Sequence, residues 1–181
     1  MIVSRRRMLR RLGGFAAGAA ALMAAPRIIM AATDARQLAF HNIHNDERIT
    51  AVYWSNGGFD DGALRDLDFA LRDWRNDQVK PVDRALFDLL HELATRLGSN
   101  EPYEIISAYR SPQTNAMLAA QSNGVATHSL HLEAKAIDIA LPSGHLAELR
   151  DVAWDMQMGG VGWYEDQFVH VDTGRVRRWN F

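Results

Sequence analysis

The stretch Ser129-Leu-His-Leu-Glu-Ala-Lys-Ala-Ile-Asp138 and the later stretch Phe168-Val-His-Val-Asp172 decide the fold that we predict for this chain. Each stretch places ionisable side chains inside a short apolar run, and such a run is typical of a buried strand. An unpaired charge in a buried strand costs several kcal/mol. We therefore expect the fold to compensate these charges where they lie.

Side chains alternate between the two faces of a strand, and this alternation sorts the ionisable groups. Asp138 lies on the face opposite its two isoleucine neighbours, and His170 and Asp172 share one face of the second run. Together with His131, two imidazoles and a carboxylate can converge from neighbouring strands. A zinc ion with three protein ligands and one open position for water commonly occupies such a site in hydrolases. Taken singly, each residue is more often an ordinary core or loop residue, so the prediction depends on the combination.

The pattern Ser-x-His-x-x-(Gly)-x-Ala-x-Asp over residues 129–138, followed by the late His170, resembles the zinc peptidases of the D-alanyl-D-alanine metallopeptidase and lysostaphin type. This group also includes the hedgehog signalling domain. The resemblance extends over nearly the whole chain. It implies Zn²⁺ as the cofactor, with His131, Asp138 and His170 as the metal ligands. The expected fold class is α+β, with a small antiparallel sheet that carries the zinc site and helices packed on one side.

The resemblance also implies residues that act on the substrate. Arg110, in Ser-Ala-Tyr-Arg-Ser-Pro, corresponds to the arginine that lies near the substrate in this group. It would orient the substrate or stabilise developing negative charge. Ser129, which opens the motif, is predicted to contact the substrate as well.

Two positions depart from the pattern of the group. The glycine of the motif is Ala134 here, a change that constrains only the local backbone. The general base of the group lies two or three residues before the last ligand, where this chain has Phe168 and Gln167. We predict Asp172 as the base because it shares a strand face with His170. Its spacing equally allows a role in orienting a metal ligand.

Composition narrows the class of protein. There is no cysteine, which excludes a disulfide framework and thiolate zinc sites. Of the 20 Lys and Arg residues, six lie in residues 1–32, which contain none of the 22 Asp and Glu residues. The remaining chain has 14 basic and 22 acidic residues, a net charge of −8. An acidic domain argues against nucleic-acid binding, which rests on phosphate neutralisation.

Residues 1–32 have the three parts of a secretory signal. Ser4-Arg-Arg-Arg-Met-Leu-Arg10 is basic, residues 12–25 are apolar, and small residues follow around Ala32. The Arg-Arg-x-apolar-Leu form indicates the twin-arginine export machinery as a partner and the periplasm as the location. A retained membrane anchor is the alternative, but an apolar segment of about fourteen residues is shorter than the roughly 20 that a membrane span requires. We expect a signal peptide over 1–32, a peptidase domain over 33–181, and no stable membrane span after processing.

Periodicity and turn residues predict the other elements. We expect strands over 38–43, 48–54 and 103–109, and helices from 60 or 61 to 74, after 81 to 97, from 112 to about 122 and from 146 to 158. His128 is a substrate contact, a group behind the ligands or a surface residue. Trp163 and Tyr164 either wall the cleft or belong to the core.

The resemblance implies a zinc-dependent murein endopeptidase that hydrolyses peptide cross-links of peptidoglycan. Two alternatives remain open. One is a D,D- or L,D-carboxypeptidase or dipeptidase that trims stem peptides, which the sequence does not distinguish from cross-link cleavage. The other is a non-catalytic, zinc-containing peptidoglycan-binding module, suggested by Gln167 and Ala134 at the two departing positions.

Overall fold

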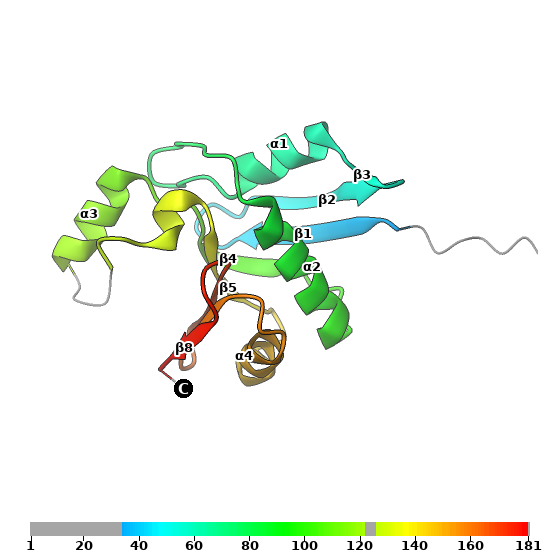
Figure 1. The fold of residues 1–181 in the computed structure, drawn as a ribbon. Helices are drawn as coiled ribbons and strands as arrows, with labels where there is room; N and C mark the ends of the chain where they lie inside the picture. The colour runs from blue at the N-terminus through cyan, green and yellow to red at the C-terminus, as the bar shows by residue number, and fades with distance from the viewer. Residues whose placement is uncertain (1–33, 122–125, 181) are drawn as a thin grey trace, which may run out of the picture. The chain divides into compact units, whose positions relative to one another are not determined.

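In a computed structural model, residues 34–121 and 126–180 are described, and within them the strands form one eight-stranded sheet (Figure 1). The strand order is β3-β2-β1-β4-β5-β7-β6-β8. The strands are β1 (Arg36–Asn42), β2 (Arg48–Ser55), β3 (Gly58–Phe59), β4 (Tyr103–Ser107), β5 (Ala136–Ala140), β6 (Gly160–Tyr164), β7 (Phe168–Asp172) and β8 (Arg177–Trp179). The helices are α1 (Asp61–Ala70), α2 (Arg84–Leu97), α3 (Pro112–Gln121) and α4 (Leu146–Asp155), with a 3₁₀ helix η1 (Leu130–Glu133).

The predicted signal peptide over residues 1–32 lies outside the described residues. Within the described ranges, no helix combines the length and the apolar character that a membrane crossing requires.

The α+β class is confirmed, but the sheet is larger than predicted and mixed in direction. β4, β5, β7 and β6 pair antiparallel, and these are the strands around the predicted metal site. The expectation of an all-antiparallel sheet was wrong at two places, because β1 pairs parallel with β4 and β6 pairs parallel with β8. The apolar pattern of a strand predicts which of its faces is buried, but not whether the neighbouring strand runs parallel or antiparallel to it.

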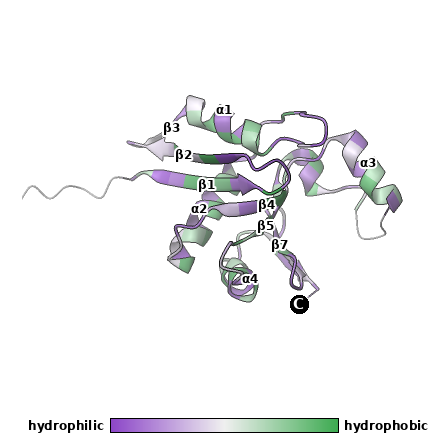
Figure 2. Ribbon diagram, turned by 180° about the vertical axis from the view of Figure 1, so that it is seen from behind, coloured by the Kyte–Doolittle hydropathy of each residue, from purple (hydrophilic) through white to green (hydrophobic). Residues whose placement is uncertain are grey.

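One face of the sheet is covered by α1, α2 and α4, as predicted for helices on one side. Register places Leu38 opposite Ala51, Phe40 opposite Ile49 and Ile105 opposite Ile139 on this face. These strand side chains pack with the apolar residues of the three helices in one buried core. Figure 2 shows that α2 and α4 carry hydrophobic and hydrophilic residues along their length, as helices with one buried side do.

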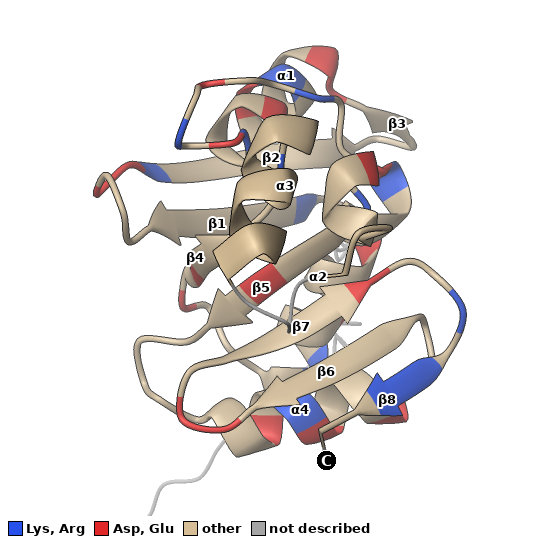
Figure 3. Ribbon diagram, turned by 90° about the vertical axis from the view of Figure 1, so that its left-hand side faces the viewer, with Lys and Arg blue, Asp and Glu red and all other residues tan. Residues whose placement is uncertain are grey.

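The helix α3 lies apart from these three, at the end of the sheet where the chain leaves β4 (Figure 1). It contains no charged residue, and Figure 3 shows it in a single colour among elements that carry charges. It therefore does not belong to the layer of helices that closes the core.

The first helix ends earlier than predicted, at Ala70 instead of residue 74. Its start is set by Asp60, whose carboxylate accepts the Ala63 N–H at 2.8 Å. Beyond Ala70 the buried Asp73 accepts the backbone N–H groups of Arg75 and Ser111, so the chain turns back towards β4. An aspartate that bonds to nearby backbone competes with the helix, which is why the apolar spacing misled the prediction.

Candidate metal centre and its cavity

Strand pairing sets two of the predicted ligands side by side. In the β5–β7 ladder Asp138 lies directly opposite His170, on the face that the helices leave uncovered. Side chains opposite each other on one face of an antiparallel pair are in reach of one another. His170 Nδ1 accordingly lies 2.8 Å from Asp138 Oδ1, and both residues are buried.

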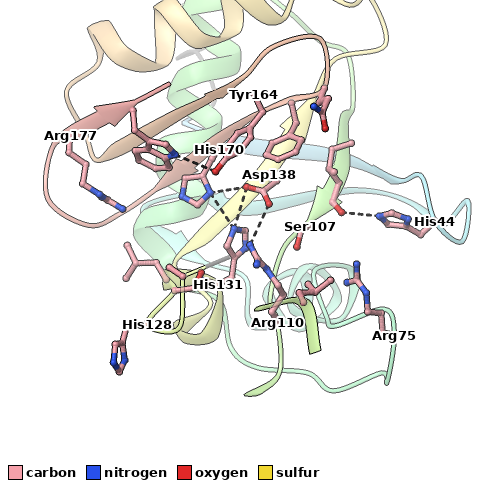
Figure 4. Close-up of a pocket in the computed structure, with 18 residues that line it drawn as sticks. His44, Arg75, Ser107, Arg110, His128, His131, Asp138, Tyr164, His170 and Arg177 are labelled. Atoms are coloured by element: carbon pink, nitrogen blue, oxygen red, sulfur yellow. Dashed lines mark hydrogen bonds and ion pairs between the residues drawn. The ribbon is translucent and has the colours of Figure 1, made fainter. Parts of the chain in front are cut away.

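The third predicted ligand arrives from a 3₁₀ turn. The prediction that His131 lies in a strand was wrong: it is part of η1, which Ser129 caps by accepting the His131 N–H at 3.3 Å. The turn closes at Ala134, which has a left-handed backbone with φ of 54°. His131 Nε2 thereby lies 3.2 Å from His170 Nδ1 and 3.3 Å from Asp138 Oδ1 (Figure 4).

In each imidazole, the nitrogen that points away from the centre makes a hydrogen bond that determines where the ring proton of the neutral tautomer lies. His131 Nδ1 lies 2.7 Å from the carbonyl oxygen of Ala108, which only accepts, so Nδ1 carries the proton. His170 Nε2 lies 3.0 Å from the Asp172 carboxylate and carries its proton for the same reason. In the neutral rings, His131 Nε2 and His170 Nδ1 therefore present lone pairs to each other and to Asp138.

The electrostatics of this centre follow from its burial. Burial lowers the pKa of His131 against the pull of Asp138 and so favours the neutral ring. Burial opposes ionisation of Asp138, but His131 and His170 outweigh it and hold the pKa of that carboxyl well below its ordinary value. Burial also lowers the pKa of His170, but Asp138 and Asp172 outweigh it and raise that pKa, so metal binding would displace the proton that His170 Nδ1 shares with Asp138. Without that proton, two imidazole nitrogens and a carboxylate face one another in a buried space. This arrangement suits a divalent cation, because a cation turns three mutually repelling acceptors into ligands.

Asp172 lies at the Nε2 side of the His170 ring, away from the other two predicted ligands. Both oxygens of its carboxylate already accept hydrogen bonds there. Its Oδ2 accepts from His170 Nε2 and from Arg177 Nη2 at 2.7 Å. Its Oδ1 accepts from Arg177 Nη1 and from the N–H groups of Gly160 and Gly174. Burial opposes its ionisation, but His170 and Arg177 outweigh it and keep its pKa low. A fully buried, fully bonded carboxylate with a low pKa is a poor base, so the geometry speaks against the predicted base role and favours the orienting one.

Arg110 lies on the other side of the centre, at the end of β4. Its backbone N–H donates to the His131 carbonyl at 3.2 Å, which ties the chain after β4 to η1. Its guanidinium Nη2 lies 3.5 Å from Asp138 Oδ2, and its buried Nε has no partner among the described residues. Arg110 therefore retains a donor for another acceptor.

These groups open into a cavity of about 640 Å³. The end of β4 and the loop after it form one wall, with Ser107 and Arg110. The segment that leads into η1 forms a second wall and includes Ser129 and the exposed His128, which Figure 4 shows directed away from the three ligands. A cavity of this size accommodates a short peptide segment.

Aromatic residues form the third wall. Tyr164 stacks on Phe168 with ring centroids 4.4 Å apart. Trp179 on β8 lies with its ring centroid 5.1 Å from that of His170, and its Nε1–H donates to the Tyr164 hydroxyl at 3.3 Å. Any side chain at Gly162 would collide with the Trp179 ring, which explains that glycine. The tryptophan can only donate, so the Tyr164 hydroxyl accepts and keeps its own proton free to donate.

Comparison with known proteins agrees with this geometry. The family model described as peptidoglycan L,D-endopeptidase MepK matches residues 30–179. The chain belongs to this family. The peptidoglycan L,D-endopeptidase MepK of Escherichia coli strain K12 is 39% identical to it over 175 residues, 96% of each chain. The probable peptidoglycan L,D-endopeptidase MepK of Haemophilus influenzae is 39% identical over 170 residues, 93% of this chain and 91% of the relative.

Membership of the MepK family confirms the resemblance to the D-alanyl-D-alanine metallopeptidase group. The structure brings the three predicted metal ligands together and sets Arg110 beside them. Ser129 caps η1 and also lines the cavity, as does Gln167, which occupies one of the two departing positions.

Sequence reasoning missed several members of this MepK-family cavity, among them Trp179 and Arg75. The pattern of residues 177–179 is too short to signal a strand, and Arg75 directly follows the helix that was predicted to end at residue 74.

Proposed function

We propose that the chain is a zinc-dependent peptidoglycan endopeptidase that hydrolyses peptide cross-links. One observation carries the proposal: two imidazole nitrogens and a carboxylate oxygen lie within 4.8 Å of one another in the lining of a cavity. The names of the related MepK proteins support peptidoglycan as the substrate.

Zinc fits the donor set. Neutral imidazole nitrogen and carboxylate oxygen are ordinary zinc ligands, and three protein ligands with one open position are typical of catalytic sites. Ligand atoms around a tetrahedral zinc ion lie roughly 3.3 to 3.6 Å apart. The separations of 2.8, 3.2 and 3.3 Å among Asp138, His131 and His170 approach this spacing. Bound there, zinc would supply Lewis-acid polarisation of the scissile carbonyl and activation of a water molecule.

Two side chains of the cavity are placed to stabilise the charge that develops on the scissile carbonyl oxygen. Arg110 offers a buried, unpaired Nε–H and a guanidinium held by Asp138. Tyr164 offers a hydroxyl proton that Trp179 leaves free. Donors fixed in advance in a buried site stabilise such charge strongly, because they do not reorganise during the reaction. We assign both residues to this role.

The remaining polar residues orient the ligands. Asp172 fixes the tautomer of His170, and the Ala108 carbonyl fixes that of His131. Among the described residues that line the cavity, Asp138 is the only carboxylate. The described lining of the cavity therefore contains no second carboxylate that could accept a proton from the attacking water.

The test is digestion of cross-linked murein sacculi by the purified, zinc-loaded protein, with and without chelator, beside His170→Ala. We expect cross-linked muropeptide dimers to disappear only when zinc and His170 are both present. Mass spectrometry of the released muropeptides then identifies the bond. His145→Ala is the matched control, because it removes an exposed histidine that does not line the cavity.

Other outcomes support the alternative functions. Shortened stem peptides with intact cross-links would indicate a carboxypeptidase or dipeptidase. Unchanged muropeptides from protein that holds zinc would indicate a binding module and would contradict the proposal.

We also propose export to the periplasm by the twin-arginine pathway, supported by the arginine pair and apolar segment in residues 4–25. Replacement of Arg5 and Arg6 by lysine preserves the charge of this segment but removes the pair. The variant should accumulate in the cytoplasm, measured by cell fractionation. Equal periplasmic amounts of the variant and the parent protein would contradict this route.

A further inference from the structure

The cavity contains an arginine that neither the fold nor the proposed zinc chemistry uses. Arg75 lies in the turn after α1, and its backbone N–H donates to Asp73 at 3.2 Å. The other oxygen of Asp73 accepts the Ser111 N–H at 2.9 Å, directly after Arg110. Because Asp73 is fully buried, it fixes the turn against the chain that carries Arg110. The position of Arg75 relative to the metal centre is thus built into the fold.

Aromatic stacking directs the Arg75 side chain. Its guanidinium carbon lies 4.3 Å from the centre of the Trp74 ring. His44 also stacks on Trp74, with ring centroids 4.2 Å apart and 15° between the planes, and its Nε2–H donates to the Ile106 carbonyl at 2.8 Å. Figure 4 shows Arg75 and His44 on the side of Arg110 away from the three ligands. Stacking reduces the freedom of the guanidinium and leaves its N–H edge available.

No carboxylate forms an ion pair with this guanidinium within residues 34–121 and 126–180. Burial lowers the pKa of Arg75, and the buried Asp73 opposes this from beyond ion-pair distance. The one carboxylate that lines the described cavity, Asp138, is already engaged by Arg110 and the two histidines. Burial lowers the pKa of Arg110, Asp138 opposes this, and nearby Arg75 lowers it further. Two guanidinium groups therefore repel each other across the cavity of a domain that is acidic overall. A bound anion would relieve that repulsion.

We propose that Arg75 binds a free carboxylate of the substrate and selects anionic stem peptides over their amidated forms. This inference rests on the proposed function and names a specificity residue for it. Arg110 engages the scissile bond beside the metal ligands, whereas Arg75 takes a carboxylate of the same peptide beyond Arg110. A guanidinium recognises a carboxylate through two parallel N–H bonds, and a carboxamide can accept only one of them.

The test compares two cross-linked peptides that differ only in a carboxylate or a carboxamide beside the scissile bond. We expect the zinc-loaded protein to prefer the carboxylate form in kcat/KM by roughly tenfold to a hundredfold. Arg75→Gln should lose this preference by slowing only the carboxylate form, and Arg75→Lys should restore part of it. Arg96→Gln is the matched control, because it removes the same charge from α2 on the opposite face of the sheet.

A binding measurement separates this inference from the endopeptidase proposal. The uncross-linked stem peptide, in carboxylate and carboxamide forms, is titrated into each zinc-loaded variant by calorimetry. Preference for the carboxylate that Arg75→Gln abolishes and Arg96→Gln retains supports the inference, whether or not cross-links are cleaved. An equal loss of both peptides in Arg75→Gln, or no preference in the parent protein, overturns it. Failure to cleave any cross-link overturns only the proposed function.

Discussion

The two faces of the β5–β7 strand pair differ in what they bury. On the face that the helices cover, Ile137, Ile139, Val169 and Val171 are almost completely excluded from solvent. On the other face, within the same few residues, Asp138 and His170 meet at 2.8 Å and both face His131. Because successive side chains of a strand point to opposite faces, neighbouring residues of β5 and β7 belong alternately to an apolar surface and to an ionisable one.

The comparison shows that the two faces make opposite contributions. Each fully buried aliphatic side chain of the covered face stabilises the fold by about 1.5 to 3 kcal/mol. The buried ionisable groups of the other face stabilise the fold little by themselves, because their mutual contacts have to offset the loss of hydration. The apolar face holds the strands in register, and that register forces the acceptors together. Substitutions on the two faces should therefore separate stability from activity.

The largest effect is expected for Asp138→Asn, which removes a charge from the polar face at constant volume. Endopeptidase activity should fall by about three orders of magnitude or more, because several kcal/mol of transition-state stabilisation disappear with the metal. Muropeptide release and zinc content measure this effect. A variant that retains zinc and activity would show that the polar face is not the metal site.

On the covered face, Ile137→Ala should reduce stability and leave the metal site intact. It should lower the free energy of unfolding by about 2 to 5 kcal/mol, because it leaves a cavity in the core, and it should leave zinc affinity unchanged where the protein is folded. Urea unfolding and zinc titration measure the two quantities. The exposed Met117→Ala on α3 is the control and should change stability little. Loss of zinc binding in folded Ile137→Ala would break the separation of the two faces.

Tyr164→Phe removes one hydroxyl from the wall of the cavity. We expect kcat to fall roughly a hundredfold, the effect of losing one fixed donor to an oxyanion, with zinc affinity unchanged. Steady-state kinetics on a cross-linked muropeptide dimer provide the measurement. An effect on KM alone would assign Tyr164 to substrate binding instead.

Asp172→Asn tests the group behind the ligand. An amide can donate to His170 Nε2 and so place the ring proton on Nδ1, the atom that faces the metal centre. Zinc affinity should fall about 10- to 100-fold. If Asp172 were instead the general base, activity would collapse while zinc affinity stayed constant.

The smallest effect is expected for Ala134→Gly, which restores the glycine of the family motif. Glycine relieves the left-handed backbone at this position, but it adds freedom to the unfolded chain and removes a buried methyl group. These terms nearly cancel, so the free energy of unfolding should change by less than about 1 kcal/mol. Thermal unfolding measures it. A larger loss would mean that the methyl group of Ala134 contributes to the closure of η1.

Some of this site could be read from the sequence because strand alternation is a local property. The apolar neighbours of Asp138 and of His170 were enough to place each of them on the strand face opposite those neighbours. His131 was identified through the spacing of its motif, although its secondary structure was predicted wrongly. A 3₁₀ turn of four residues leaves little periodic signal.

Other parts depended on tertiary placement. Alternation showed that Asp172 shares a face with His170, but not that it lies behind the ring, where Arg177 binds it. Arg75 reaches the cavity because Asp73 turns the chain back towards β4. No local pattern marks that turn, since apolar residues at helical spacing continue through it.

Zinc titration tests the central claim most directly, with single variants of each ligand measured by competition with a coloured chelator. We predict one tight site in the parent protein and in His128→Ala. We predict loss of that site in His131→Ala, Asp138→Ala and His170→Ala, each of which removes one of the converging acceptors. Unchanged zinc binding in these three variants, or loss of binding in His128→Ala, would contradict the assignment of the metal centre.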